Sequence, residues 1–112
     1  MLDRDHSIVE HILRYCEQIA TAHEDFGRSE NTFRSSTTYQ NAVSMCILQI
    51  GELVNHLSDE FKNTYSEMPW RQIRGMRNYV AHEYGSIDLD VVWHVATINM
   101  ESLKAFCENH LA

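Results

Sequence analysis

The chain has 112 residues, 44% of them hydrophobic, with four glycines and one proline. This length suits one domain over residues 1–112, and the composition is typical of a helical globular protein. The formal net charge of −7 excludes a broadly basic nucleic-acid-binding module, because an acidic surface as a whole repels phosphate.

The sequence also indicates where the protein is located. Its apolar runs fall short of the roughly 18 residues that a membrane span needs, and the first six residues are too polar for a signal peptide. We therefore expect a cytoplasmic protein without a membrane contact.

Cys16, Cys46 and Cys107 fall in apolar stripes without close pair spacing, so we interpret them as reduced core thiols.

The first half of the chain predicts two long helices. Apolar residues recur at three- and four-residue spacing from Ile8 to Ala20, which is typical of an amphipathic helix ending near Gly27. A polar link over residues 28–31 follows. Thr37 with Gln40 forms a plausible capping box for a second helix, which runs to about residue 57. Gly51 within that helix would let another helix approach closely.

The second half predicts shorter helices and a final amphipathic one. Ser58 followed by two acids is typical of a helix start, and Pro69 suits the first turn of the next helix. We expect that helix to reach about His82. Gly85 breaks the pattern and Asp88 can cap a last helix that carries an apolar stripe. Without strand alternation, the prediction is an all-α, antiparallel four- to five-helix bundle.

Arg77 and His82 are the strongest candidates for chemistry. Arginine stays charged and forks onto phosphate, while imidazole moves protons near neutral pH. Together they would suit phosphodiester cleavage without a metal. Alternatively, an arginine and a histidine near a helix end satisfy the helix dipole. Tyr84 could reach the same cleft, or be a partly buried aromatic residue whose hydroxyl meets water.

Positive charge is concentrated around this pair. Arg71, Arg74 and Arg77 lie within seven positions, and no acidic residue occurs between Glu67 and Glu83. An exposed basic edge on an amphipathic helix would give the same pattern. On a continuous helix, Arg74, Asn78 and His82 share one face, because they are four residues apart. Arg77 would then have to wrap over Asn78 to meet the imidazole.

The segment from Pro69 to Tyr84 resembles the HepT-like branch of the HEPN domains. The signature of that branch, Arg-x4-His-x-Tyr, is present as Arg77, His82 and Tyr84. The resemblance extends to Asp88 and Trp93 downstream, and to the step Ile50-Gly51-Glu52 in the preceding long helix. It therefore covers most of the chain.

This resemblance implies a metal-independent endoribonuclease, the toxin of a type VII HepT/MntA-like toxin–antitoxin pair. It implies a homodimer with Arg77 and His82 of both protomers lining a cleft, where Asn78 would orient the pair or hydrogen-bond the phosphate. We expect Arg74 to support phosphate binding. The implied partner is an MntA-type minimal nucleotidyltransferase that attaches AMP to Tyr84. The alternative is a non-catalytic helical module that binds substrate or dimerises beside a nucleotidyltransferase.

We expect neither a cofactor nor a metal. His6 with Glu10, and Glu52 with His56, have i,i+4 spacing, yet no glutamate has a histidine three residues later, as a di-iron bundle site requires. These pairs are interpreted as surface contacts or as the lining of a partner interface. Nucleotide-binding Gly-x4-Gly-Lys and Gly-x-Gly-x2-Gly motifs do not occur.

Overall fold

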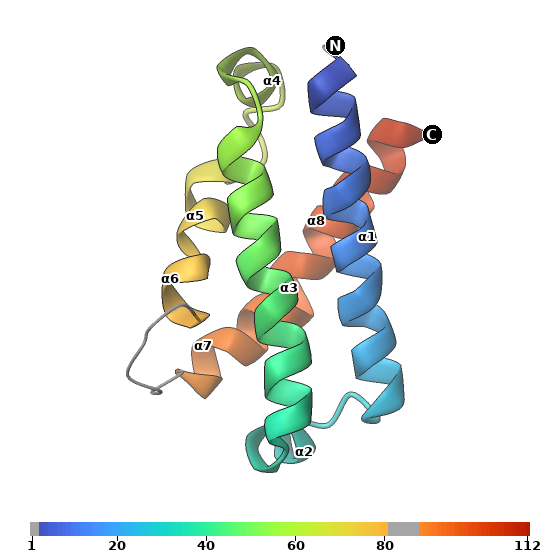
Figure 1. Ribbon diagram of the computed structural model, residues 1–112, viewed down its shortest axis with the longest axis vertical. Helices are drawn as coiled ribbons and strands as arrows, with labels where there is room; N and C mark the ends of the chain where they lie inside the picture. The colour runs from blue at the N-terminus through green and yellow to red at the C-terminus, as the bar shows by residue number, and fades with distance from the viewer. Residues whose placement is uncertain (1–2, 81–87) are drawn as a thin grey trace.

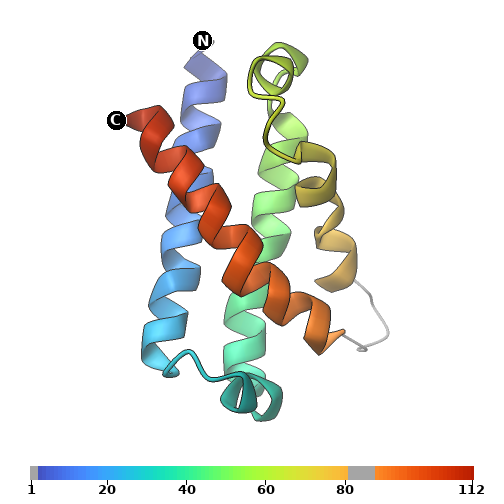
Figure 2. The same ribbon diagram turned by 180° about the vertical axis from the view of Figure 1, so that it is seen from behind.

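The computed structural model describes residues 3–80 and 88–112, and every regular element in these two ranges is a helix. The long helices α1 (Asp3–Asp25) and α3 (Thr37–His56) lie side by side and run antiparallel (Figure 1). Helix α8 (Met100–Leu111) crosses behind them and packs on α1 (Figure 2). The predicted all-α bundle is thus confirmed.

The connection between α1 and α3 differs from the prediction. Gly27 and Arg28 have φ values of 74° and 50°, a left-handed turn that stops α1 near the expected position. A short helix, α2 (Glu30–Ser35), begins within the predicted link over residues 28–31. The predicted capping box is also wrong, because Ser36 rather than Thr37 accepts the hydrogen bond from Tyr39 N at the start of α3.

Helix α4 (Asp59–Thr64) begins as predicted and is tied to α1. The Ser58 hydroxyl accepts a hydrogen bond from Phe61 N at 3.1 Å, which caps α4. In turn, the buried Asp5 carboxylate accepts from Ser58 N at 2.9 Å and from Ser58 Oγ at 2.6 Å. A single acid near the start of α1 therefore orders the turn between α3 and α4.

The sequence predicts one helix after Pro69, but the structure forms two shorter ones there. The segment divides into α5 (Trp70–Gly75) and α6 (Arg77–Val80), with a break at Met76. Gly75 has a low helix propensity, and Met76 is buried, so the chain turns where packing on α3 requires it. The predicted continuation to His82 lies outside the described residues.

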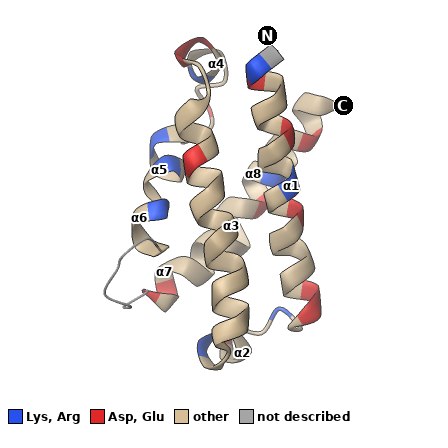
Figure 3. Cartoon of the chain, viewed as in Figure 1, with Lys and Arg blue, Asp and Glu red and all other residues tan. Residues whose placement is uncertain are grey.

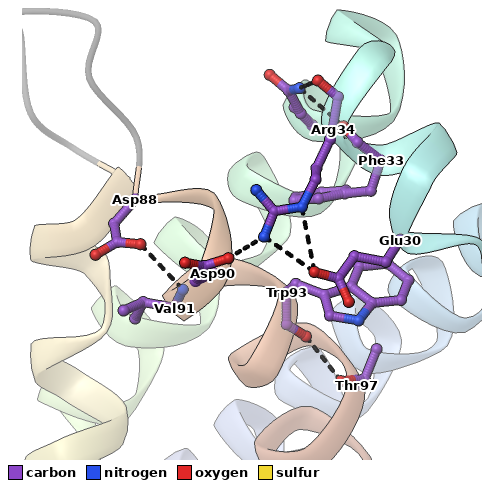
Figure 4. A network of polar contacts seen from close by, with 9 residues as sticks. Glu30, Phe33, Arg34, Asp88, Asp90, Val91, Trp93 and Thr97 are labelled. Carbon is purple, nitrogen blue, oxygen red and sulfur yellow. Dashed lines mark hydrogen bonds and ion pairs between the residues drawn. The ribbon is translucent and has the colours of Figure 1, made fainter.

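The last helical rod contains a wider turn that the sequence does not reveal. Asp88 caps α7 (Leu89–His94) by accepting from Val91 N, as expected (Figure 4). A π-helical turn, Val95–Asn99, then joins α7 to α8. On the surface, Arg34 of α2 forms ion pairs with Glu30 and with Asp90 of α7, and so connects the start of α7 to the bundle (Figure 4).

A buried histidine lies within the aromatic part of the core. His23 is hydrogen-bonded through Nδ1 to the Tyr39 hydroxyl, and its Nε2 donates to the Ala96 carbonyl at 3.2 Å. Trp93 packs edge-on against His23 beside the core, and Trp70 is buried. This network joins α1, α3 and the π-helical turn.

The three cysteines are buried free thiols, as predicted. Burial raises the pKa of Cys46 to about 11 and that of Cys107 to about 12, and it raises the pKa of Cys16 still further. Within residues 3–80 and 88–112, no helix is both long enough and apolar enough to cross a bilayer.

Candidate functional site

The described part of the candidate site lies where α5 and α6 pack against α3. Arg77 begins α6, and Arg74 lies in the last turn of α5. Asn78 follows Arg77 and is exposed. His82 and Tyr84 lie outside the described residues, so the expected meeting of Arg77 with the imidazole stays a prediction.

Arg77 is held by Glu52, an acid that is distant from it in the sequence. Nη1 of Arg77 donates a hydrogen bond to Oε1 of Glu52, which comes from the facing helix α3. The Arg77 side chain is 29% exposed and that of Glu52 is 47% exposed. The guanidinium is therefore partly sheltered and oriented, yet it remains accessible to an anion from solvent.

Gly51 makes this approach possible, as the sequence suggested. A Cβ atom at position 51 would lie 3.0 Å from Cβ of Arg77 and 3.2 Å from the carbonyl oxygen of Arg74. Such distances are below ordinary van der Waals contact. The missing side chain of Gly51 thus lets the α5–α6 segment lie directly on α3, beside Glu52.

Arg74 and Asn78, which a continuous helix would place on one face, line different hollows. Met76, between α5 and α6, keeps a right-handed helical backbone with φ −60° and ψ −28°. Arg74 faces a groove between α4 and α5, whereas Asn78 lines a hollow with Tyr79. Tyr79 is 47% exposed.

Basic residues gather on this side of the molecule. Figure 3 shows Lys and Arg along α5 and α6, while acidic residues are spread over α1, α3, α4, α7 and α8. Arg71 and Arg74 are exposed, and neither forms an ion pair with a carboxylate of the described ranges. The local excess of positive charge was predicted, although Glu52 offsets part of it.

The remaining acid–histidine pairs do not build a metal centre in the described part of the chain. His6 Nε2 lies 3.8 Å from Glu10 Oε1, and both side chains are about half exposed, so this is a surface contact. Glu52 pairs with Arg77 rather than with His56. Among the described residues, no group of three or more histidine, cysteine or acidic side chains could hold a metal ion.

Glu52 is the site residue whose role the sequence did not assign. Its i,i+4 spacing to His56 drew attention to the wrong partner, because Arg77 is 25 positions away in the chain. The signal that could have identified it is Gly51 immediately before it. A glycine inside a long amphipathic helix marks a close approach, and an acid next to it in the chain lies near that contact, although its partner follows only from the tertiary arrangement.

Comparisons with known proteins show the family of this chain. The family model described as "Ribonuclease HepT-like" matches residues 8–110. A Thermococcus cleftensis protein named as a probable ribonuclease HepT is 33% identical over 95 residues, 80% of this chain and 86% of the relative. A Caldanaerobacter subterraneus protein named as a putative RNase is 33% identical over 96 residues, 86% of this chain and 84% of the relative.

A third relative is larger. The Methanocaldococcus jannaschii protein named as a gamma-glutamylcyclotransferase and putative RNase is 33% identical over 94 residues, 84% of this chain. The match spans 41% of the length of that protein. The comparison with solved structures found no match. With the family model covering nearly the whole chain, the protein belongs to the ribonuclease HepT-like family.

Proposed function

We propose that this protein is a metal-independent endoribonuclease, the toxin of a type VII HepT/MntA-like toxin–antitoxin pair that acts in the cytoplasm. The observation that carries the proposal is Arg77, partly sheltered and held by Glu52 at a point of close packing on α3. Membership of the ribonuclease HepT-like family supports the choice of RNA, and the names of several relatives include an RNase.

In the proposed reaction, the 2′-hydroxyl of RNA attacks the adjacent phosphorus. His82 accepts the proton of that hydroxyl and then delivers a proton to the departing 5′-oxygen. Arg77 binds the scissile phosphate and stabilises its added negative charge. The P–O bond to the 2′-oxygen forms and the P–O bond to the 5′-oxygen breaks, leaving a 2′,3′-cyclic phosphate and a 5′-hydroxyl. Asn78 and Arg74 assist by binding phosphate.

Glu52 adds a positioning role to this scheme. Its carboxylate restricts the long Arg77 side chain before substrate arrives, so less side-chain freedom is lost on binding. Because both groups are partly exposed, a phosphate can approach the outer side of the guanidinium. The five N–H donors of arginine allow one carboxylate and one phosphate to be bound at once.

Assembly and control follow from the same proposal. A symmetric dimer would place Arg77 and His82 of both protomers across one cleft, which light scattering at micromolar concentrations can test. The proposed antitoxin is an MntA-type nucleotidyltransferase that transfers AMP to Tyr84. The added phosphate would compete with RNA for Arg77. Incubation with that enzyme, ATP and magnesium, followed by peptide mass spectrometry, distinguishes Tyr84 from the exposed Tyr79.

The test of the activity itself is cleavage of RNA in excess chelator. We expect wild-type protein to cleave, and Arg77→Ala and His82→Ala each to lose about 10²–10⁴ in rate, the usual worth of a positioned acid/base or charge-stabilising group. Arg14→Gln is the control, because Arg14 is an exposed cation on α1.

The result also separates the rival function. Folded Arg77→Ala or His82→Ala protein that cleaves at the wild-type rate would refute the catalytic assignment. Wild-type protein that does not cleave would favour a non-catalytic module acting beside a nucleotidyltransferase.

A further inference from the structure

A groove between α4 and α5 collects three cations, of which the proposed reaction uses Arg74 alone. It has a volume of about 820 Å³, within the range of ligand-binding pockets. Lys62, Arg71 and Arg74 line it, with Asp59 as the acidic member of the lining. Three cations against one carboxylate is unusual in a chain whose formal net charge is −7. We call this hollow the α5 groove.

Within residues 3–80 and 88–112, the cations of the α5 groove form no ion pair. Arg28, Arg34 and Arg77 form ion pairs with Glu101, with Glu30 and Asp90, and with Glu52, respectively. Lys62, Arg71 and Arg74 form none with any carboxylate of the described ranges. With respect to the described residues, their charge can therefore attract an anion, and the walls of a groove concentrate that attraction.

A second hollow adjoins the α5 groove and has a different chemistry. Its volume is about 500 Å³, and Gln72 lines both hollows, so they lie on either side of α5. Asn78 and the exposed Tyr79 line the second hollow. An exposed phenol ring offers a surface for base stacking, and the two amides can hydrogen-bond base edges.

We propose that single-stranded RNA lies across α5, with backbone phosphates in the α5 groove and a base against Tyr79. This inference rests on the proposed ribonuclease function and extends the substrate beyond the phosphate at Arg77. An acidic protein surface could also bind three cations. Nucleic acid fits better, because phosphates alone explain the α5 groove, whereas bases also explain an aromatic ring and amides next to it.

A binding experiment tests this proposal independently of cleavage. The probe is a short fluorescent 2′-O-methyl RNA, which lacks the attacking hydroxyl, and its anisotropy is followed across a salt series. We expect Lys62→Gln/Arg71→Gln to weaken binding about 25-fold near 0.1 M salt. The slope of log K against log salt should fall by about 1.4, since each phosphate contact to a single strand contributes about 0.7.

The chain offers a matched control for charge. Arg14→Gln/Lys104→Gln removes the same two charges from α1 and α8, where neither residue lines the α5 groove or forms an ion pair with a described carboxylate. This control variant should change the RNA affinity and the salt slope far less than the groove variant does. Tyr79→Leu should weaken binding about tenfold with an unchanged slope, as expected for lost stacking, and Tyr79→Phe should bind as the wild type does.

The outcomes separate this inference from the proposed function. Equal losses in the groove variant and in its control, or no loss in either, would overturn the inference while leaving cleavage of unmodified RNA as evidence for a ribonuclease. Groove-dependent RNA binding without cleavage would support the inference and refute the ribonuclease. If the groove variant binds RNA normally but no longer binds the cognate nucleotidyltransferase, the α5 groove serves a protein partner and the inference is wrong.

Discussion

Gly51→Ala should destabilise the protein at the point that holds Arg77. The new methyl group would lie 3.0 Å from Cβ of Arg77 and 3.2 Å from the Arg74 carbonyl oxygen. Neither atom is the free end of a flexible side chain, so the α5–α6 segment must shift. Such overpacking costs about 1–3 kcal/mol. The better helix propensity of alanine returns up to about 1 kcal/mol.

Gly75→Ala is the matched control for this variant. It makes the same chemical change at the end of α5, where a Cβ atom would meet nothing within 4 Å. We expect this variant to be as stable as the wild type, or up to about 1 kcal/mol more stable. The difference in unfolding free energy between the two variants isolates the overpacking. Urea unfolding at equilibrium measures it, and the melting temperatures should differ by several degrees.

The same pair of variants tests whether the contact matters for the proposed reaction. A shift of α6 moves the guanidinium of Arg77 relative to Glu52, so RNA cleavage by Gly51→Ala should fall well below that of Gly75→Ala at temperatures where both are folded. If Gly51→Ala is as stable as Gly75→Ala, the α5–α6 segment accommodates a side chain, and the close-packing argument is wrong.

Three further predictions concern charge, pH and capping. Glu52→Gln should lower both kcat and KM about fivefold, because Arg77 is less restrained and its competing carboxylate is gone; unchanged values would refute the positioning role. Burial keeps the thiols of Cys46 and Cys107 neutral in the folded protein, with raised pKa values of about 11 and 12. The contribution of these thiols to the free energy of unfolding should therefore be constant below pH 9 and fall above it, by on the order of 1 kcal/mol per pH unit per thiol, until each folded pKa is reached. A flat urea-unfolding profile from pH 9 to 10.5 would contradict this. Asp5→Ala should cost about 2–3 kcal/mol in the same assay, because two hydrogen bonds from the start of α4 are lost.

Local chemistry made part of the fold predictable. The apolar stripe of α1 and the caps at Ser58 and Asp88 depend on residues within a few positions of one another, and all three are observed. Gly51 was also informative, because a glycine weakens the interior of a long helix and is kept there where another segment packs closely. Where the candidates differ by one position, as between Ser36 and Thr37, the sequence alone did not decide the cap.

The features that were missed depend on packing between distant segments. The break at Met76 occurs where the α5–α6 segment lies on Gly51, and no pattern in residues 69–82 encodes that contact. The pairing of Arg77 with Glu52 depends on the register of α3 against α6. The contact between Asp5 and Ser58 joins residues 53 positions apart for the same reason. Each requires the tertiary arrangement before it can be inferred.

An acidic chain can bind RNA because charge acts over short distances. At physiological ionic strength, the attraction between exposed charges fades over about 8 Å, so acids on the far side of α1 or α8 hardly oppose a phosphate in the α5 groove. Among the described residues, Glu52 is the carboxylate that contacts Arg77, and the guanidinium already compensates its charge. The net charge of −7 therefore limits non-specific binding over the rest of the surface. RNA bound by such a protein should depend on the few cations of one face, and removing two of them should matter more than removing two from any other face.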